Sequence, residues 1–165
     1  MRIMKSIKQY WKQFSDTHNT SLTIPKAWKF GDGTKEMGNE LAELVVKGRK
    51  KATCSAKCIH DIKNEAIPVE GQYNIVLNGE NEPVCIIQYT KVSITPMNQV
   101  TEEFAALEGE DDLSYKYWYN EHERFFRKEL GLLNIDFTSD IELVCQEFKV
   151  VDINRTVIQN RKGDE

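Results

Sequence analysis

The residues best suited to bind an anion lie between positions 47 and 57. Five cations fall there with no acidic residue among them, namely Lys47, Arg49, Lys50, Lys51 and Lys57. The whole chain carries a formal net charge of −4, so this local positive charge indicates a site for a nucleotide or another anion. A structural role is the alternative, because cations also stabilise the negative end of a helix, and Gly48 ends a predicted helix.

A group of acids follows further along the chain. Six acidic residues fall between positions 102 and 112 with no basic residue among them, namely Glu102, Glu103, Glu108, Glu110, Asp111 and Asp112. Most of them are expected to be solvated. Glu108 differs because it follows the apolar end of a predicted helix and precedes Gly109, where the chain can turn sharply. A carboxylate at that point could face a cavity, although a surface glutamate is the simpler alternative.

Three aromatic residues are candidates for stacking on a base, an interaction worth about 1–3 kcal/mol. Trp118 lies on the apolar stripe of a predicted helix and is expected in the core. Trp28 lies in an irregular segment and is the better stacking candidate. Tyr117 lies off the stripe, so its hydroxyl is expected to face a cleft or water.

The four cysteines and three histidines are the candidates for metal binding. Cys54 and Cys58 lie four residues apart, the other cysteines lie alone in apolar stretches, and the histidines are scattered. Zinc-site sequences usually show two close pairs of ligands. The spacing therefore predicts reduced, mostly buried thiols, with no disulfide, no metal and no other cofactor.

The elements that must position these residues follow from periodicity. Apolar residues recur every three or four positions over residues 5–16, 98–107 and 114–130, which predicts amphipathic helices. A further helix is expected from Thr34, a good N-cap residue, to Gly48.

Alternating apolar residues predict the strands. We expect a short strand at 53–57, a hairpin over 72–95 that turns at Asn78–Pro83, and a final strand at 143–151. Residues 59–66 are expected to form one helical turn.

This order of elements predicts one α+β domain over residues 1–153 and a flexible tail over 154–165. Strands and helices do not alternate regularly, so a mainly antiparallel sheet or small barrel with flanking helices is expected. The sequence has no GxGxxG motif, P-loop or serine-centred hydrolase elbow. Because no apolar run approaches about 20 residues and the start lacks the apolar core of a signal peptide, we expect a cytoplasmic protein without a membrane partner.

The stretch Gly48-x-Lys50-x-x-Thr53-x-Ser55 resembles the signature of the ASCH domain family, a branch of the PUA-like β-barrels. Four other segments agree with the resemblance in order and spacing, namely residues 28–32, 40–45, 83–87 and 103–110. The chain resembles the longer bacterial ASCH proteins over about residues 7–152.

This resemblance implies a small, mainly antiparallel PUA-like β-barrel with a cleft lined by the signature. ASCH domains are generally proposed to bind RNA or nucleotides, and a nuclease activity has been described in the longer branch. Some compact members hydrolyse the amide of N-acetylated cytidine, and their catalytic lysine, threonine and glutamate correspond to Lys50, Thr53 and Glu108. The chain departs from the broader signature at Ser55, where a basic residue is usual, and at Thr53, where an acid is frequent.

We expect Lys50, Thr53 and Glu108 to face one cavity beside the helix at 98–107. In one scheme Thr53 attacks the amide, and Lys50 is the base if burial lowers its pKa from about 10.4. In the other scheme Glu108 activates a water, while Lys50 and Thr53 stabilise the oxyanion. An ionised Glu108 close to Lys50 favours the second scheme.

Two functions are therefore expected. The first is a hydrolase that acts on a modified nucleoside or on RNA, and the alternative is a non-catalytic binding module for RNA, a nucleotide or a modified base. Substrate contacts are expected from Trp28, Arg49, Ser55 and Tyr117. The net charge disfavours a long nucleic-acid groove.

Overall fold

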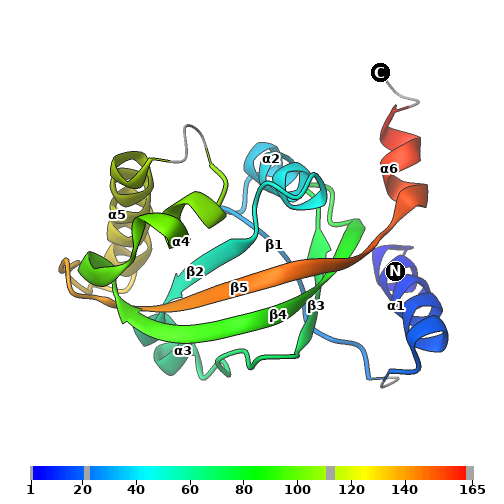
Figure 1. Cartoon of the computed structure of the whole chain (residues 1–165), viewed down its shortest axis with the longest axis horizontal. Helices are drawn as coiled ribbons and strands as arrows, with labels where there is room; N and C mark the ends of the chain where they lie inside the picture. Colours follow the sequence, from blue (N-terminus) through cyan, green and yellow to red (C-terminus); the bar gives the residue numbers. More distant parts are fainter. Residues whose placement is uncertain (1, 21–22, 111–113, 163–165) are drawn as a thin grey trace. The chain divides into compact units, whose positions relative to one another are not determined.

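The computed structural model describes residues 2–20, 23–110 and 114–162 (Figure 1). Helices and strands are both present and are not regularly alternated. In chain order the elements are α1 (Arg2–His18), β1 (Ala27–Lys29), α2 (Lys35–Val46), β2 (Ala52–Ala56), α3 (Lys57–Lys63), β3 (Tyr73–Leu77), β4 (Pro83–Pro96), the 3₁₀ turn η1 (Met97–Gln99), α4 (Glu102–Leu107), α5 (Tyr115–Gly131), β5 (Glu142–Ile153) and α6 (Arg155–Lys162).

The five strands follow the order β1-β3-β4-β5-β2. Strand β1 pairs with β3 in parallel, whereas β3 pairs with β4, and β2 with β5, in antiparallel fashion. The predicted α+β class with a mainly antiparallel sheet and flanking helices is therefore confirmed. None of the helices in the described ranges is long and apolar enough to cross a membrane.

The chain forms two compact units. The first comprises the residues up to 48, residues 73–88 and the residues from 149 onward, and the second comprises residues 49–72 and 89–148. Strands β4 and β5 contribute residues to both units. Among the candidate site residues, only Trp28 belongs to the first unit, so the chemistry of the second unit can be described by itself.

In the first unit, helix α1 packs through the apolar stripe that its sequence predicts. Tyr10, Trp11 and Phe14 are buried against Ile75 and Ile86 of the β3–β4 hairpin. Helix α2 begins as expected after Thr34, whose hydroxyl accepts a hydrogen bond of 3.3 Å from the Met37 amide. Capping of this kind satisfies an amide that has no partner inside the helix.

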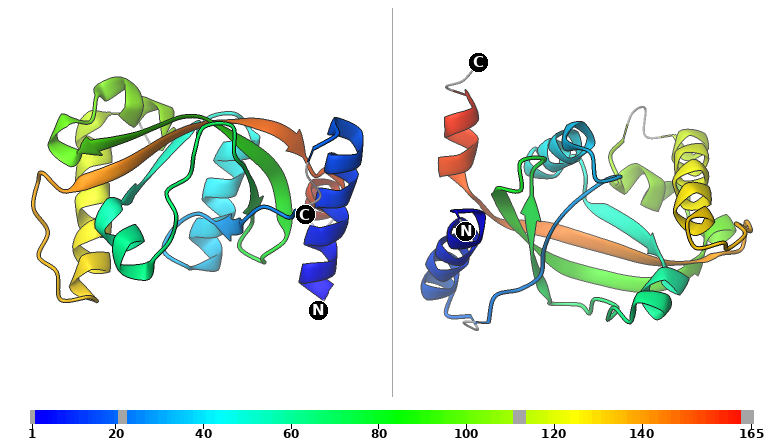
Figure 2. Two further views of the ribbon diagram at one scale, coloured as in Figure 1. Left: turned by 90° about the horizontal axis from the view of Figure 1, so that it is seen from below. Right: turned by 180° about the vertical axis from the view of Figure 1, so that it is seen from behind.

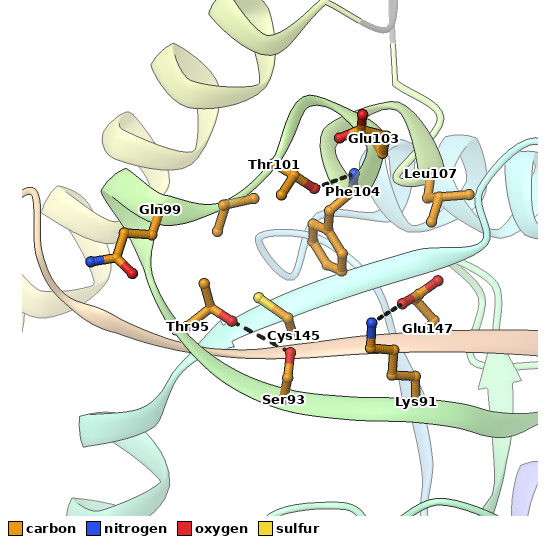
Figure 3. Close-up of a pocket in the computed structure, with 11 residues that line it drawn as sticks. Lys91, Ser93, Thr95, Gln99, Thr101, Glu103, Phe104, Leu107, Cys145 and Glu147 are labelled. Atoms are coloured by element: carbon orange, nitrogen blue, oxygen red, sulfur yellow. Dashed lines mark hydrogen bonds and ion pairs between the residues drawn. The ribbon is translucent and has the colours of Figure 1, made fainter.

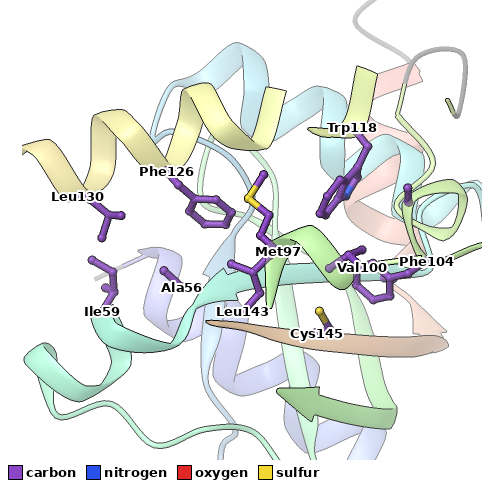
Figure 4. Close-up of a cluster of buried hydrophobic side chains, with 12 residues drawn as sticks. Ala56, Ile59, Met97, Val100, Phe104, Trp118, Phe126, Leu130, Leu143 and Cys145 are labelled. Carbon is purple, nitrogen blue, oxygen red and sulfur yellow. The ribbon is translucent and has the colours of Figure 1, made fainter. Parts of the chain in front are cut away.

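In the second unit, helices α4 and α5 pack against β2 and β5 around one apolar core (Figure 4). The two helices contact each other and lie side by side in Figures 1 and 2. Trp118, Phe126 and Leu130 of α5 are buried, as are Ala56 and Leu143 on the strands. This confirms the prediction that Trp118 is a core residue.

Several segments differ from the expected elements. Trp28, expected in an irregular segment, lies in strand β1. The region 98–107 is divided into η1 and α4, because Thr101 caps a new helix by accepting a 3.1 Å hydrogen bond from the Phe104 amide. Helix α3 begins at Lys57, before the expected turn at 59–66, and ends at Lys63 with the C-cap Asn64, which has a left-handed φ of 54°. Residues 155–162, expected in a tail, form helix α6; the flexibility of that segment stays a prediction.

Candidate functional site

Two backbone segments meet where the site is built, and a glycine allows them to do so. The Lys51 amide donates a 2.7 Å hydrogen bond to the Leu107 carbonyl, which fastens the start of β2 to the end of α4. Gly109 has a φ of +72°, and a Cβ atom there would lie 2.1 Å from the Arg49 carbonyl oxygen. Only glycine permits this approach, and the approach brings Lys50 beside Glu108.

Lys50 and Glu108 form a buried ion pair. The Lys50 Nζ atom lies 3.2 Å from Glu108 Oε1 and 3.4 Å from the Glu108 carbonyl oxygen. It also lies 3.6 Å from Glu110 Oε2. The side chains of Lys50 and Glu108 are each only 2% exposed. The prediction that these two residues come together is confirmed, as is the inward orientation of Glu108.

Three further groups contact the second carboxylate oxygen of Glu108, Oε2. His122 Nε2 lies 3.0 Å from Oε2, and the Cys54 thiol donates to it over 3.5 Å. The indole N–H of Trp118 also donates to this oxygen. We call Lys50, Cys54, Glu108, Trp118 and His122 the charged cluster; it joins α4, α5 and the start of β2.

The ionisation of the cluster follows from its contacts. Burial alone would raise the pKa of Glu108, but the charges of Lys50 and His122 and the hydrogen bonds from His122 and Trp118 outweigh it and lower this pKa to about 2. Burial would lower the pKa of Lys50, but Glu108 and Glu110 outweigh it, and that pKa is raised. Burial and the nearby Glu108 charge raise the pKa of the Cys54 thiol.

His122 is doubly protonated in this arrangement. Its Nδ1 atom lies 2.7 Å from the Trp118 carbonyl oxygen, and its Nε2 atom faces the Glu108 carboxylate. Both partners can only accept, so both ring nitrogens must donate. Burial opposes the charged ring, but Glu108 outweighs burial and raises the pKa of His122.

A cavity of about 310 Å³ lies next to α4 in the second unit (Figure 3). Strands β4 and β5, the η1–α4 turn and α4 line it with Lys91, Ser93, Thr95, Gln99, Val100, Thr101, Glu103, Phe104, Leu107, Cys145 and Glu147. Lys91 and Glu147 lie 3.9 Å apart at its edge. A cavity beside the 98–107 region was predicted, but the three residues expected to face it, Lys50, Thr53 and Glu108, are not among those that line this one.

Cys145 connects this cavity to the charged cluster. It lines the cavity and is paired in register with Cys54, which donates to Glu108. Burial, followed by the Glu108 charge, raises the pKa of Cys145 to about 12. All four cysteines are free thiols.

The family model of the ASCH domain matches residues 26–152. The chain belongs to the ASCH domain family. A crystal structure of an Enterococcus faecalis protein is 46% identical, covers 94% of each chain and has a TM-score of 0.88. The crystal structure of an ASCH domain from Lactobacillus crispatus is 35% identical, covers 92% of this chain and 94% of that one, and has a TM-score of 0.78. No curated protein matches the chain.

Thr53 is not brought into the charged cluster of this ASCH domain. In strand β2, Ala52, Cys54 and Ala56 contribute to the core that α4 and α5 cover. Successive side chains of a strand point to opposite faces, so Thr53 and Ser55 lie on the other face. The structure therefore joins two members of the expected Lys–Thr–Glu set and separates the third.

The expected substrate-binding residues are in four different settings. Ser55 Oγ lies 2.8 Å from His60 Nε2, on the Thr53 face. Arg49 is exposed, and Tyr117 is half-buried in the first turn of α5. Trp28, in the first unit, donates a 2.6 Å hydrogen bond to Asn74 Oδ1.

The other charged residues of the acidic and basic stretches lie in different settings. Glu102 and Glu103 are exposed, as expected for solvated acids, whereas Asp111 and Asp112 lie outside the described residues. Among the cations, Lys47 pairs with Glu43 at 2.7 Å and Lys57 with Asp61 at 3.4 Å, each across one helical turn. Lys47, the C-cap of α2, fits the structural alternative for the basic stretch, whereas Lys57 lies at the start of α3.

Sequence reasoning missed Cys54 and His122 as members of the cluster. His122 carries a usable signal, because it follows Trp118 by four positions and so shares its helix face. Cys54 carries a signal because it alternates with Ala52 and Ala56. Small residues at every second position of a strand indicate a face that other elements cover.

Proposed function

We propose that this ASCH protein binds a neutral nucleoside-type ligand in the cavity beside α4, either as a modified nucleoside or as an unpaired base of RNA. The observation that carries the proposal is the mixed lining of the cavity. Its volume of about 310 Å³ falls at the lower end of the range typical of small-molecule sites, about 300–1,000 Å³.

The lining combines the two properties that recognition of a base requires. Phe104, Val100 and Leu107 supply an apolar wall for the flat face of a base. Ser93 and Thr95 supply hydroxyls on β4 that can both donate and accept at the edge of a base. Aromatic and apolar walls with a few polar groups are the usual design of such sites.

The charge of the cavity favours the nucleoside over its phosphates. Lys91 is the one cation in the lining, against Glu103 and Glu147. A phosphate inside the cavity would therefore meet excess negative charge. The exposed residues Arg49 and Lys51 adjoin the end of α4 through backbone contacts, where they could contact the RNA backbone on either side of a bound base.

Calorimetric titration with cytidine, N-acetylated cytidine, cytidine monophosphate and a short single-stranded RNA tests this proposal. Ser93→Ala and Gln99→Ala should each weaken nucleoside binding about tenfold, the cost of one lost hydrogen bond. Lys128→Ala, an exposed substitution on α5, is the control and should bind like the wild type. Equal affinity in all variants, or no nucleoside binding at millimolar concentration, contradicts the proposal.

Hydrolysis of an acylated cytidine is the second candidate, and one observation favours it. Lys50 Nζ lies 3.2 Å from Glu108 Oε1, and an ion pair of this kind suits the scheme in which Glu108 activates a water and Lys50 stabilises an oxyanion. The scheme with Lys50 as the base is not favoured, because the pKa of Lys50 is raised.

Single-turnover hydrolysis of N-acetylated cytidine, followed by mass spectrometry, tests the second candidate. Glu108→Gln should lower the rate by at least about 10²-fold if Glu108 moves protons. Thr53→Ala reports separately on Thr53 because it leaves the cluster untouched. A wild-type protein that binds the nucleoside without releasing acetate would leave binding as the function.

A further inference from the structure

We propose that Cys54, Glu108 and His122 form a binding site for a divalent transition metal of the zinc class. Each residue offers one ligand atom, and the three atoms lie within 4.8 Å of one another. Glu108 Oε2 lies 3.0 Å from His122 Nε2 and 3.5 Å from Cys54 Sγ. This inference does not depend on the nucleoside ligand, and it reverses the expectation from cysteine and histidine spacing that the chain holds no metal.

The spacing of the ligand atoms fits tetrahedral coordination. Zinc binds thiolate, imidazole and carboxylate at about 2.0–2.3 Å, which separates tetrahedral ligands by about 3.3–3.7 Å. The separations of Glu108 Oε2 from His122 Nε2 and from Cys54 Sγ, 3.0 and 3.5 Å, lie close to that range. Small side-chain rotations therefore suffice, and the backbones of β2, α4 and α5 can stay in place.

The surrounding groups already orient the ligands. A histidine that binds a metal almost always donates its other ring N–H to a carbonyl or carboxylate. His122 does this through Nδ1, which lies 2.7 Å from the Trp118 carbonyl oxygen, so its Nε2 atom faces the site. Lys50 holds the other carboxylate oxygen, Oε1, at 3.2 Å. Glu108 thus presents Oε2 to the metal and keeps Oε1 for Lys50.

The charge balance of the cluster permits the exchange of protons for a metal. The Cys54 thiol proton and the His122 Nε2 proton both point at the Glu108 carboxylate. Their release would leave a thiolate, a neutral imidazole and a carboxylate, the deprotonated forms that bind metals. One divalent cation carries the charge of two protons, so the net charge around Lys50 and Glu110 does not change.

The exposed edge of the site lies at His122, and the site offers three protein ligands. The His122 side chain is 14% exposed, whereas those of Lys50 and Glu108 are 2% exposed. An ion can therefore approach past the imidazole ring. Three protein ligands are the number found in zinc sites that keep a fourth position for water or substrate.

Cobalt binding by the chelator-treated, full-length protein tests the inference directly. Co²⁺ should give a thiolate-to-metal charge-transfer band and intense tetrahedral bands, and equimolar Zn²⁺ should abolish both. Cys54→Ser should lose the charge-transfer band, and both Cys54→Ser and His122→Gln should lower metal affinity by about 100-fold or more. Cys58→Ser and His60→Gln are the matched controls and should bind like the wild type.

A second measurement keeps the test independent of any weakened folding in the variants. Zn²⁺ should raise the Tm of the wild type and of Cys58→Ser, because a ligand that binds only the folded state stabilises it. It should not raise the Tm of Cys54→Ser. About two protons should be released for each zinc ion bound near neutral pH. The absence of a cobalt band in the wild type, or equal metal affinity in Cys54→Ser, would overturn the inference.

Discussion

Strand β2 presents different chemistry on its two faces. On the face covered by α4 and α5, Cys54 lies between two buried alanines and donates to the ionised Glu108. On the other face, Thr53 and Ser55 are half-buried, and Ser55 lies 2.8 Å from His60. Neighbouring positions of one sequence motif therefore belong to separate environments. The difference teaches that motif spacing must be combined with strand alternation before its residues are assigned to one site.

Lys50→Ala should give the largest effect, because it removes one partner of a buried ion pair. Breaking such a pair typically costs about 3–5 kcal/mol of unfolding free energy. The Lys50 side chain is only 2% exposed, so water cannot take the place of the lost partner of Glu108. Lys51→Ala, on an exposed neighbour, should change stability by less than about 0.5 kcal/mol. Urea unfolding of both variants measures the contrast, and equal costs would contradict the buried pair.

Acidification should destabilise the protein through Glu108, which contacts the face of β2 that α4 and α5 cover. The pKa of Glu108 falls from 4.5 to about 2 on folding. The contribution of ionised Glu108 to the free energy of unfolding is therefore fully present above pH 4.5. That contribution is lost as the pH falls from 4.5 toward 2, because the unfolded state binds the proton first. Glu108→Gln should flatten this part of the stability curve. Urea midpoints measured between pH 2 and pH 5 would argue against the cluster if wild type and variant lose stability in parallel.

The two faces of β2 should also differ in their response to alanine. Cys54→Ala removes a hydrogen bond to a charged group and should cost about 1.5–3 kcal/mol. Thr53→Ala changes mainly strand propensity and should cost less than about 1 kcal/mol. Thermal or urea unfolding gives both values. A larger cost at Thr53 than at Cys54 would place the sensitive contacts on the other face.

Local patterns in the sequence predicted most of the fold. The stripe of α1, the Thr34 cap and the turn at Asn78 each act within a few residues, so they could be recognised without the structure. Division of the 98–107 helix escaped prediction because the Thr101 cap competes with a continuous apolar pattern.

The site was predictable only in part. The resemblance to the ASCH family predicted that Lys50 and Glu108 share one site, although they are 58 positions apart in the sequence. Lys50 precedes strand β2, which begins at Ala52. The direction of its side chain therefore does not follow the alternation that places Thr53 and Cys54 on opposite faces. The cavity depends on the register of β4 and β5 and on the position of α4 against them. These are long-range features that no local sequence pattern predicts.

The central claim is that a nucleoside binds in the cavity beside α4, and amide chemical shifts test it most directly. Titration of isotope-labelled protein with N-acetylated cytidine should shift amides in the segments 91–95, 99–107 and 145–147, which contain the residues that line the cavity. The side-chain methyl group of Thr53, on the opposite face of β2, should change little. Saturable shifts centred on Thr53 and Ser55, with the cavity amides unchanged, would contradict the account.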